Sequence, residues 1–219
     1  MSGDGSCATL PWWYNDVGTN MLNPSLDMQH VLCGKRKKKI PGNKPILFIA
    51  LYPSGIVNNE EQKYHWAFLI GPKKEKSAHV PGVRCHVKNV PRPTPHGRAV
   101  EWTYEESKLH NVRTSNSLLI RVVIGKVVDM ERLLDTIRNV PLVQNDRMWR
   151  CCTWCADVLA ALERDGQALG TAVLDWKRIQ KVARHYAGAK TAQGRFAAGN
   201  SMDKPKPTWD MLKDKETVA

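Results

Sequence analysis

The order of hydrophobic patterns along the chain predicts an α+β protein whose sheet is mainly antiparallel. Short apolar runs typical of strands fill residues 46–127, whereas apolar residues at helical spacing dominate after Asp129. Because strands and helices are grouped rather than alternating, parallel βαβ units are not expected. The sequence therefore predicts an antiparallel β-sheet packed with helices.

Five segments have the pattern of strands. Residues 46–52 form a continuous apolar run that ends at Pro53, which is typical of a strand buried on both faces. In residues 64–70 alternate positions divide between two faces, so His65 lies opposite to its aromatic neighbours. Further strands are expected at 83–87, 99–104 and 118–127, with a proline-rich loop between the first two of these.

Three helices are expected after the strands. Asp129 is a candidate N-cap for the first. The second runs from about 151 to 165 and ends at Gly166, and the third covers residues 175–189. These limits predict a domain over residues 45–196, between a weakly ordered basic arm at 1–44 and a loosely ordered tail at 197–219.

Size and charge narrow the class of protein. The chain has 219 residues and a formal net charge of +12, and Lys35–Lys39 carries five of these positive charges in one run. This run is a candidate contact for nucleic acid or an acidic protein. We expect no secretory signal and no transmembrane segment, because no apolar stretch has the required length or flanks. Six cysteines are too few for a disulfide lattice, which indicates a cytoplasmic protein, or a nuclear one.

Three cysteines cluster at the start of the second helix. Backbone amides at a helix N-terminus favour a thiolate, so Cys151 or Cys152 is a candidate nucleophile with a lowered pKa. Other interpretations are a redox pair formed by Cys152 and Cys155, and a buried structural role for Cys155. Zinc binding would need further ligands at suitable spacing, and these are missing, so we expect no metal and no cofactor.

Two histidines on neighbouring predicted strands are the candidate bases. His65 and His86 can share a sheet face, where the second imidazole would orient the first to accept a thiol proton. The alternative is a half-buried His65 bonded to a backbone carbonyl. Glu105 and Glu106 have no partner at a catalytic spacing and are interpreted as surface residues.

Two segments carry a family resemblance. Y-H-W-A-F-L-I-G at 64–71 and R-C-C-T-W-C-A-D-V-L at 150–159 resemble the circularly permuted NlpC/P60 superfamily, which contains the lecithin–retinol acyltransferase-like thiol enzymes. The resemblance implies a permuted papain-like fold with Cys151 as nucleophile, His65 as base and His86 as the second histidine. Cys152 is the fallback nucleophile. Arg150 stands where the acyltransferases carry asparagine.

Residues 46–196 also resemble a fungal protein family without known activity, through an L-F-I-A-L-Y strand, a Y-H-W strand and a W-x-C-x-x-W helix start. The first resemblance implies a thiol hydrolase or acyltransferase acting on an amide or ester. Its acyl substrate would be a small molecule, a peptide or a lipid. The alternative is a non-catalytic accessory protein on the same fold, which binds an acidic partner through its basic arm.

Overall fold

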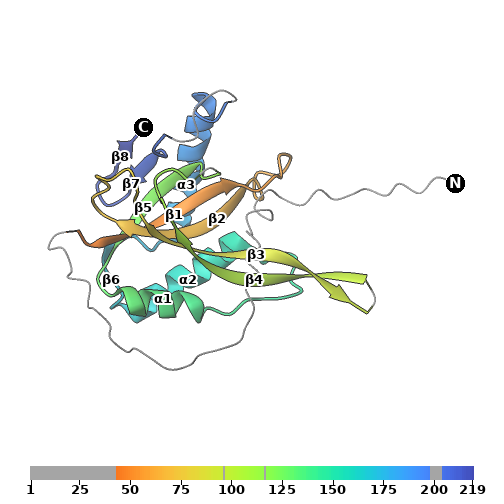
Figure 1. The fold of residues 1–219 in the computed structure, drawn as a ribbon. Helices are drawn as coiled ribbons and strands as arrows, with labels where there is room; N and C mark the ends of the chain where they lie inside the picture. Colours follow the sequence, from red (N-terminus) through yellow and green to blue (C-terminus); the bar gives the residue numbers. More distant parts are fainter. Residues whose placement is uncertain (1–42, 96, 116, 198–203) are drawn as a thin grey trace, which may run out of the picture.

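In a computed structural model, the described strands of the chain form one sheet (Figure 1). The structure describes residues 43–219 apart from 96, 116 and 198–203. The strand order of the sheet is β4-β3-β2-β1-β5-β7-β8, and β6 pairs with β5. Every neighbouring pair is antiparallel except β5 with β7. The expected α+β class with a mainly antiparallel sheet is therefore confirmed. The strands are β1 (Pro45–Pro53), β2 (Tyr64–Pro72), β3 (Gly82–Thr94), β4 (Gly97–Leu109), β5 (Ile120–Val127), β6 (Leu169–Ala172), β7 (Thr208–Asp210) and β8 (Lys215–Val218).

Helices cover one face of this sheet. α2 (Cys151–Asp165) packs on β2 and β3, α3 (Trp176–Ala192) packs on β5 and β1, and α1 (Met130–Arg138) packs against α2 (Figure 1). The main core lies between these helices and the sheet, where Phe68 contacts Trp154 edge to face with 5.7 Å between the ring centroids. The alternation predicted for β2 holds, because Tyr64, Trp66, Phe68 and Ile70 all belong to this core.

The opposite face of the sheet carries a smaller apolar cluster that includes Ala67 and Leu69. Arg121 is buried beside it, donates to both Glu75 carboxylate oxygens at 2.6 and 2.9 Å, and stacks over the Phe48 ring. Because a buried cation must be paired, this bidentate contact lets the charge remain inside the fold.

The helix boundaries follow the expected capping chemistry. Asp129 accepts from the Arg132 amide and caps α1, and Asp175 caps α3 in the same way. Gly166 ends α2 in the left-handed region at φ 62°, a conformation that glycine adopts without steric cost. No helix among the described residues is long and apolar enough to cross a membrane.

The expectation of a proline-rich loop between the third and fourth strands is wrong. The segment expected to be a proline-rich loop belongs to β3, which pairs with β4 over thirteen residues from Gly82↔Leu109 to Thr94↔Gly97. β2 pairs with β3 only at residues 83–85, so within the described part of the chain the far half of β3 has no strand on its second side, which tolerates Pro91 and Pro93. The resulting hairpin extends away from the sheet (Figure 1).

The C-terminal part of the chain is also better ordered than predicted. Residues 197–219 were expected to form a loose tail, but β7 pairs with β5 and β8 pairs with β7. Both strands are too short for an alternation signal to be visible in the sequence. The basic arm, including Lys35–Lys39, lies outside the described residues.

Candidate active site

The candidate site lies where β2 and β3 diverge. The two strands are paired only at Phe68↔Cys85, Leu69↔Arg84 and Ile70↔Val83, so among the described residues the start of β2 has no ladder partner on this side. α2 packs on β2 and β3 and begins at Cys151, which lines the same cavity as the β2 residues Tyr64 and His65. The divergence therefore lets the helix start and the β2 backbone meet in one cavity.

His65 and His86 share a sheet face, as the sequence predicted. His65 is directly opposite Tyr52 in the β1–β2 register, and Tyr52 belongs to the cluster on the face away from the helices. The His65 Nε2 and His86 Nδ1 atoms are 2.8 Å apart, and both rings are buried. Their centroids lie 5.1 Å apart in an edge-on arrangement.

Glu105 completes this chain of hydrogen bonds. Its Oε1 atom lies 3.1 Å from His86 Nε2, because His86 and Glu105 are direct partners in the β3–β4 register. The pKa of Glu105 is far below its usual range, chiefly because the carboxylate accepts from His86, with further contacts from Lys88 and Ser107. The interpretation of Glu105 as a surface residue is therefore wrong, since 29 % of its side chain is exposed and its oxygens face these donors.

The carboxylate fixes the tautomer of both rings. An ionised Glu105 can only accept, so His86 Nε2 donates to it, and a neutral His86 must then accept at Nδ1. His65 therefore donates through Nε2, which assigns the proton-accepting lone pair of a neutral His65 to Nδ1. Burial lowers the pKa of both histidines, and the neighbouring His86 lowers that of His65 further, so both rings are neutral near pH 7.

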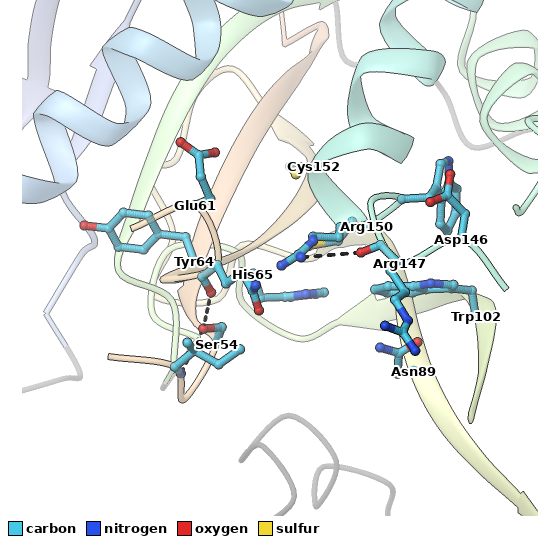
Figure 2. A pocket seen from close by; sticks show the side chains of 14 residues that line it. Ser54, Glu61, Tyr64, His65, Asn89, Trp102, Asp146, Arg147, Arg150 and Cys152 are labelled. Carbon is cyan, nitrogen blue, oxygen red and sulfur yellow. Dashed lines mark hydrogen bonds between the residues drawn. The ribbon is translucent and has the colours of Figure 1, made fainter. Parts of the chain in front are cut away.

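A cavity of about 310 Å³ brings the candidate residues together (Figure 2). Cys151, Cys152 and His65 line it, whereas His86 and Glu105 lie behind His65, outside the lining. The other lining residues are polar or aromatic side chains from the β1–β2 loop, β2, β3, β4 and the segment before α2, together with one aliphatic residue: Ser54, Ile56, Glu61, Gln62, Tyr64, Asn89, Trp102, Asp146, Arg147, Trp149 and Arg150.

Cys151 is the first residue of α2, and its thiol faces backbone amides. Burial raises the pKa of the thiol to about 12, while the Trp66 amide and the amides of Cys151 and Cys152 act in the opposite direction. The expected lowering of the pKa by the helix start is thus present but smaller than the effect of burial. The contact with Trp66 sets the sulfur beside the residue that follows His65 on β2.

The other cysteine of α2 with a predicted role, besides the two candidate nucleophiles, is Cys155. Cys155 is fully buried in the main core, which fits its predicted structural role, and burial raises its pKa. Cys151, Cys152 and Cys155 are all free thiols. No group of three or more histidine, cysteine or acidic side chains suited to a metal ion occurs within the part of the chain that the structure describes.

Sequence reasoning missed Glu105 and the aromatic walls of the cavity. The register of a β3–β4 hairpin places Glu105 opposite His86, but Pro91 and Pro93 predicted a loop instead of that hairpin. Trp102 on β4 and Trp149 before α2 meet with ring centroids 5.4 Å apart. Only a three-dimensional fold brings these two positions together.

Comparison with known proteins identifies a family but no activity. The model of a family of unknown function, DUF6914, matches residues 44–218. No curated protein and no solved structure matches the chain. The matched range ends at Val218, the last residue of β8, in agreement with a sheet that includes the C-terminal strands.

Proposed function

Because the chain belongs to the family of unknown function DUF6914, we propose its activity from its own cavity: it is a cysteine-dependent hydrolase or acyltransferase that acts on an amide or ester. One observation carries this proposal. The hydrogen-bonded series Glu105, His86 and His65 ends at a cavity that Cys151, the first residue of α2, also lines. A nucleophile, a base and groups that orient the base are the components of covalent acyl transfer.

The proposed reaction has two stages. In the first, Cys151 sulfur bonds to the substrate carbonyl carbon while His65 Nδ1 takes the thiol proton. The bond to the leaving group then breaks, and the leaving group departs with that proton, which leaves a thioester. In the second stage, water or an acceptor hydroxyl or amine attacks the thioester and gives a proton to His65. Collapse releases the acid, ester or amide and returns the proton to the Cys151 sulfur.

The surrounding groups assist at defined points. When His65 is protonated it becomes a buried cation, and the negative charge of Glu105, relayed through His86, stabilises it. Amides of the first turn of α2 face the sulfur and are suitable donors for an oxygen that gains negative charge. Because the pKa values favour a neutral thiol beside a neutral imidazole, the proton moves during the attack rather than before it.

The proposed chemistry agrees with a permuted papain-like fold, in which a helix start supplies the thiol and neighbouring strands supply two histidines. Cys151 is the proposed nucleophile because its sulfur contacts the Trp66 amide next to His65, and Cys152 remains the second candidate. We also propose a cytoplasmic location, where thiols stay reduced, or a nuclear one that depends on Lys35–Lys39.

The test is the reaction with p-nitrophenyl acetate, a small activated ester. We expect release of nitrophenol together with an acetyl thioester on Cys151, detected by mass spectrometry of the intact protein. Cys151→Ser and His65→Ala should each abolish the thioester, and both variants should keep the wild-type circular dichroism spectrum. Equal acetylation of wild type and His65→Ala would overturn the assignment of the base.

A second candidate function is a non-catalytic binding protein on the same fold, which contacts an acidic partner through the basic arm. It is favoured by the burial of the Cys151 thiol, which raises its pKa to about 12, because a protonated cysteine is a weak nucleophile. A protein of this kind would form no thioester, and deletion of residues 35–39 would abolish its binding to an acidic protein or to nucleic acid.

A further inference from the structure

The cavity next to the thiol contains two arginines whose side chains have no carboxylate partner among the described residues. Arg147 and Arg150 both line it, and the guanidinium of Arg150 donates only to the backbone oxygen of Arg147, at 3.4 Å. In Figure 2 the Arg150 guanidinium points toward His65, whereas Arg147 extends past Trp102 toward Asn89. Guanidinium groups that converge on one cavity are typical of sites for carboxylate or phosphate.

The acidic side chains of the same cavity are otherwise engaged. Glu61 pairs with Arg184 at 3.2 Å, on the side of α3. Asp146 accepts the Met148 amide at 2.7 Å within its own loop. With Glu61 neutralised by Arg184, the lining keeps two arginines against one aspartate, so its local charge is positive.

The cavity volume and walls restrict what can accompany the anionic group. A volume of about 310 Å³ is at the lower end of small-molecule sites. Tyr64, Trp102 and Trp149 supply flat apolar walls. A short acyl unit or one terminal group of a larger molecule fits this space.

From these observations we infer that the acyl substrate carries an anionic group, a carboxylate or a phosphate, that binds Arg147 and Arg150 beside the Cys151 thiol. This inference rests on the proposed thiol function for the identity of the reacting atom. It adds the chemical class of the substrate, and it assigns Arg147 and Arg150 to binding.

Paired alkylating reagents test the charge preference at the thiol itself. Iodoacetate and iodoacetamide both alkylate sulfur through their CH₂ carbon with loss of iodide. Iodoacetate adds a carboxymethyl group and carries a carboxylate, whereas iodoacetamide adds a neutral carbamoylmethyl group. In a Cys152→Ser background, we expect the iodoacetate-to-iodoacetamide rate ratio at Cys151 to exceed that of N-acetylcysteine at the same pH. In Arg147→Gln/Arg150→Gln the ratio should fall about tenfold, because two nearby cations no longer attract the reagent.

Matched variants separate charge from shape and from distance. Arg147→Lys/Arg150→Lys keeps both charges and should retain most of the preference. Arg164→Gln removes one positive charge from the last turn of the same helix, roughly 20 Å from Cys151, and should leave the ratio unchanged. A wild-type ratio equal to that of N-acetylcysteine, or a ratio unaffected by the double glutamine variant, would overturn the inference.

A binding measurement covers the case of an unreactive thiol and distinguishes the two anions. At constant ionic strength, acetate or methylphosphonate should raise the Tm of the wild type and not that of Arg147→Gln/Arg150→Gln. The anion with the larger shift identifies carboxylate or phosphate as the recognised group, and the absence of both shifts overturns the inference. Failure of the proposed function has a different signature, namely acetylation by p-nitrophenyl acetate that is unaffected by His65→Ala.

Discussion

At the scale of single residues, Glu105 and Glu106 form a natural matched pair. They are adjacent on β4 and face opposite sides of the sheet: Glu105 contacts His86, whereas Glu106 pairs with Arg138 of α1. Glu105→Gln removes the charge that stabilises protonated His65 and allows the wrong tautomer of His86. We expect thioester formation from p-nitrophenyl acetate to slow by about tenfold or more.

Glu106→Gln is the control for this variant, since it removes the same charge one residue away without touching the histidines. Its rate of thioester formation should stay near the wild-type value. Equal rates in the two variants would show that Glu105 does not act through His86. A pH profile sharpens the test, because only Glu105→Gln should displace the limb that reports His65.

Two adjacent thiols in the cavity pose a second question at the residue scale. Neighbouring helix positions point about 100° apart, so one thiol at most can have the correct orientation toward His65. Cys151→Ser should abolish acetylation, and Cys152→Ser should retain at least roughly half of it, both measured by mass spectrometry after brief exposure to the ester. The reverse result would transfer the nucleophile to Cys152.

Alternation along the predicted strands was sufficient to place the side chains of His65 and Trp66 on different faces of β2, and it predicted that His86 can share the face of His65. It could not predict the protonation of Cys151. The direction of a pKa shift depends on the balance between burial and amide hydrogen bonds, and burial follows from how α2 packs against β2. A helix-start cysteine in the sequence specifies only the second of these effects.

At the scale of elements, the Gln144 side chain attaches the segment between α1 and α2 to β4, beside the ring contact of Trp149 with Trp102. The Gln144 amide accepts from Trp102 N–H and donates to Trp102 C=O, at 2.9 Å in both cases, which imitates a strand pair at the sheet edge. The same segment contributes Asp146, Arg147 and Trp149 to the cavity. Gln144 is therefore a positioning residue for one cavity wall.

Gln144→Ala removes both hydrogen bonds. We expect the free energy of unfolding in urea to fall by about 1 kcal/mol, because the bonds are exposed and their net contribution is modest. The iodoacetate preference of Cys151 should also decrease, since the arginine-bearing wall is less well positioned. Val143→Ala, at the exposed neighbouring position, should change neither quantity. An unchanged stability of Gln144→Ala would show that the Gln144–Trp102 hydrogen bonds do not hold this segment on β4.

Proline was the main source of error at this scale. Pro91 and Pro93 suggested a loop, yet both lie in the β3–β4 hairpin, beyond the point where the pairing of β2 with β3 ends. A residue without an N–H is tolerated there because no described strand pairs with the second side of β3 at these positions. Local sequence does not reveal which strands lack a neighbour, so neither the β3–β4 hairpin nor the position of Glu105 beside His86 was predicted.

At the scale of the whole molecule, the C-terminal strands had no sequence signal of their own. β7 and β8 have three and four residues, and β7 pairs with the β5 edge 87 residues earlier in the chain, for example at Val122↔Trp209. By contrast, the long apolar strands and the capped helices were predictable because each carries a local periodicity. The fold class followed from local patterns, whereas the limits of the domain required long-range pairing.

The buried ionisable groups also determine how the stability of the whole molecule depends on pH. His65 and His86 have lowered pKa values in the fold and ordinary values near 6.5 when unfolded, so the unfolded chain binds more protons in mildly acidic solution. The free energy of unfolding should therefore fall as the pH drops below about 6.5, by up to about 1.4 kcal/mol per pH unit for each ring. The charges that face these rings are Glu105, Lys88 and Arg84.

The Cys151 thiol acts at the other end of the range. Its pKa is raised from about 9 to about 12, so the folded state binds the extra proton, and stability should decline as the pH rises above about 9. Urea unfolding at pH 5, 7 and 10 measures both limbs. Cys151→Ala should make the alkaline limb less steep without removing it, because burial also raises the pKa values of Cys85 and Cys155, and His65→Asn/His86→Asn should flatten the acid limb. If the double histidine variant kept the wild-type acid slope, the rings would not be held neutral in the fold, and the proton transfer proposed for His65 would lose its basis.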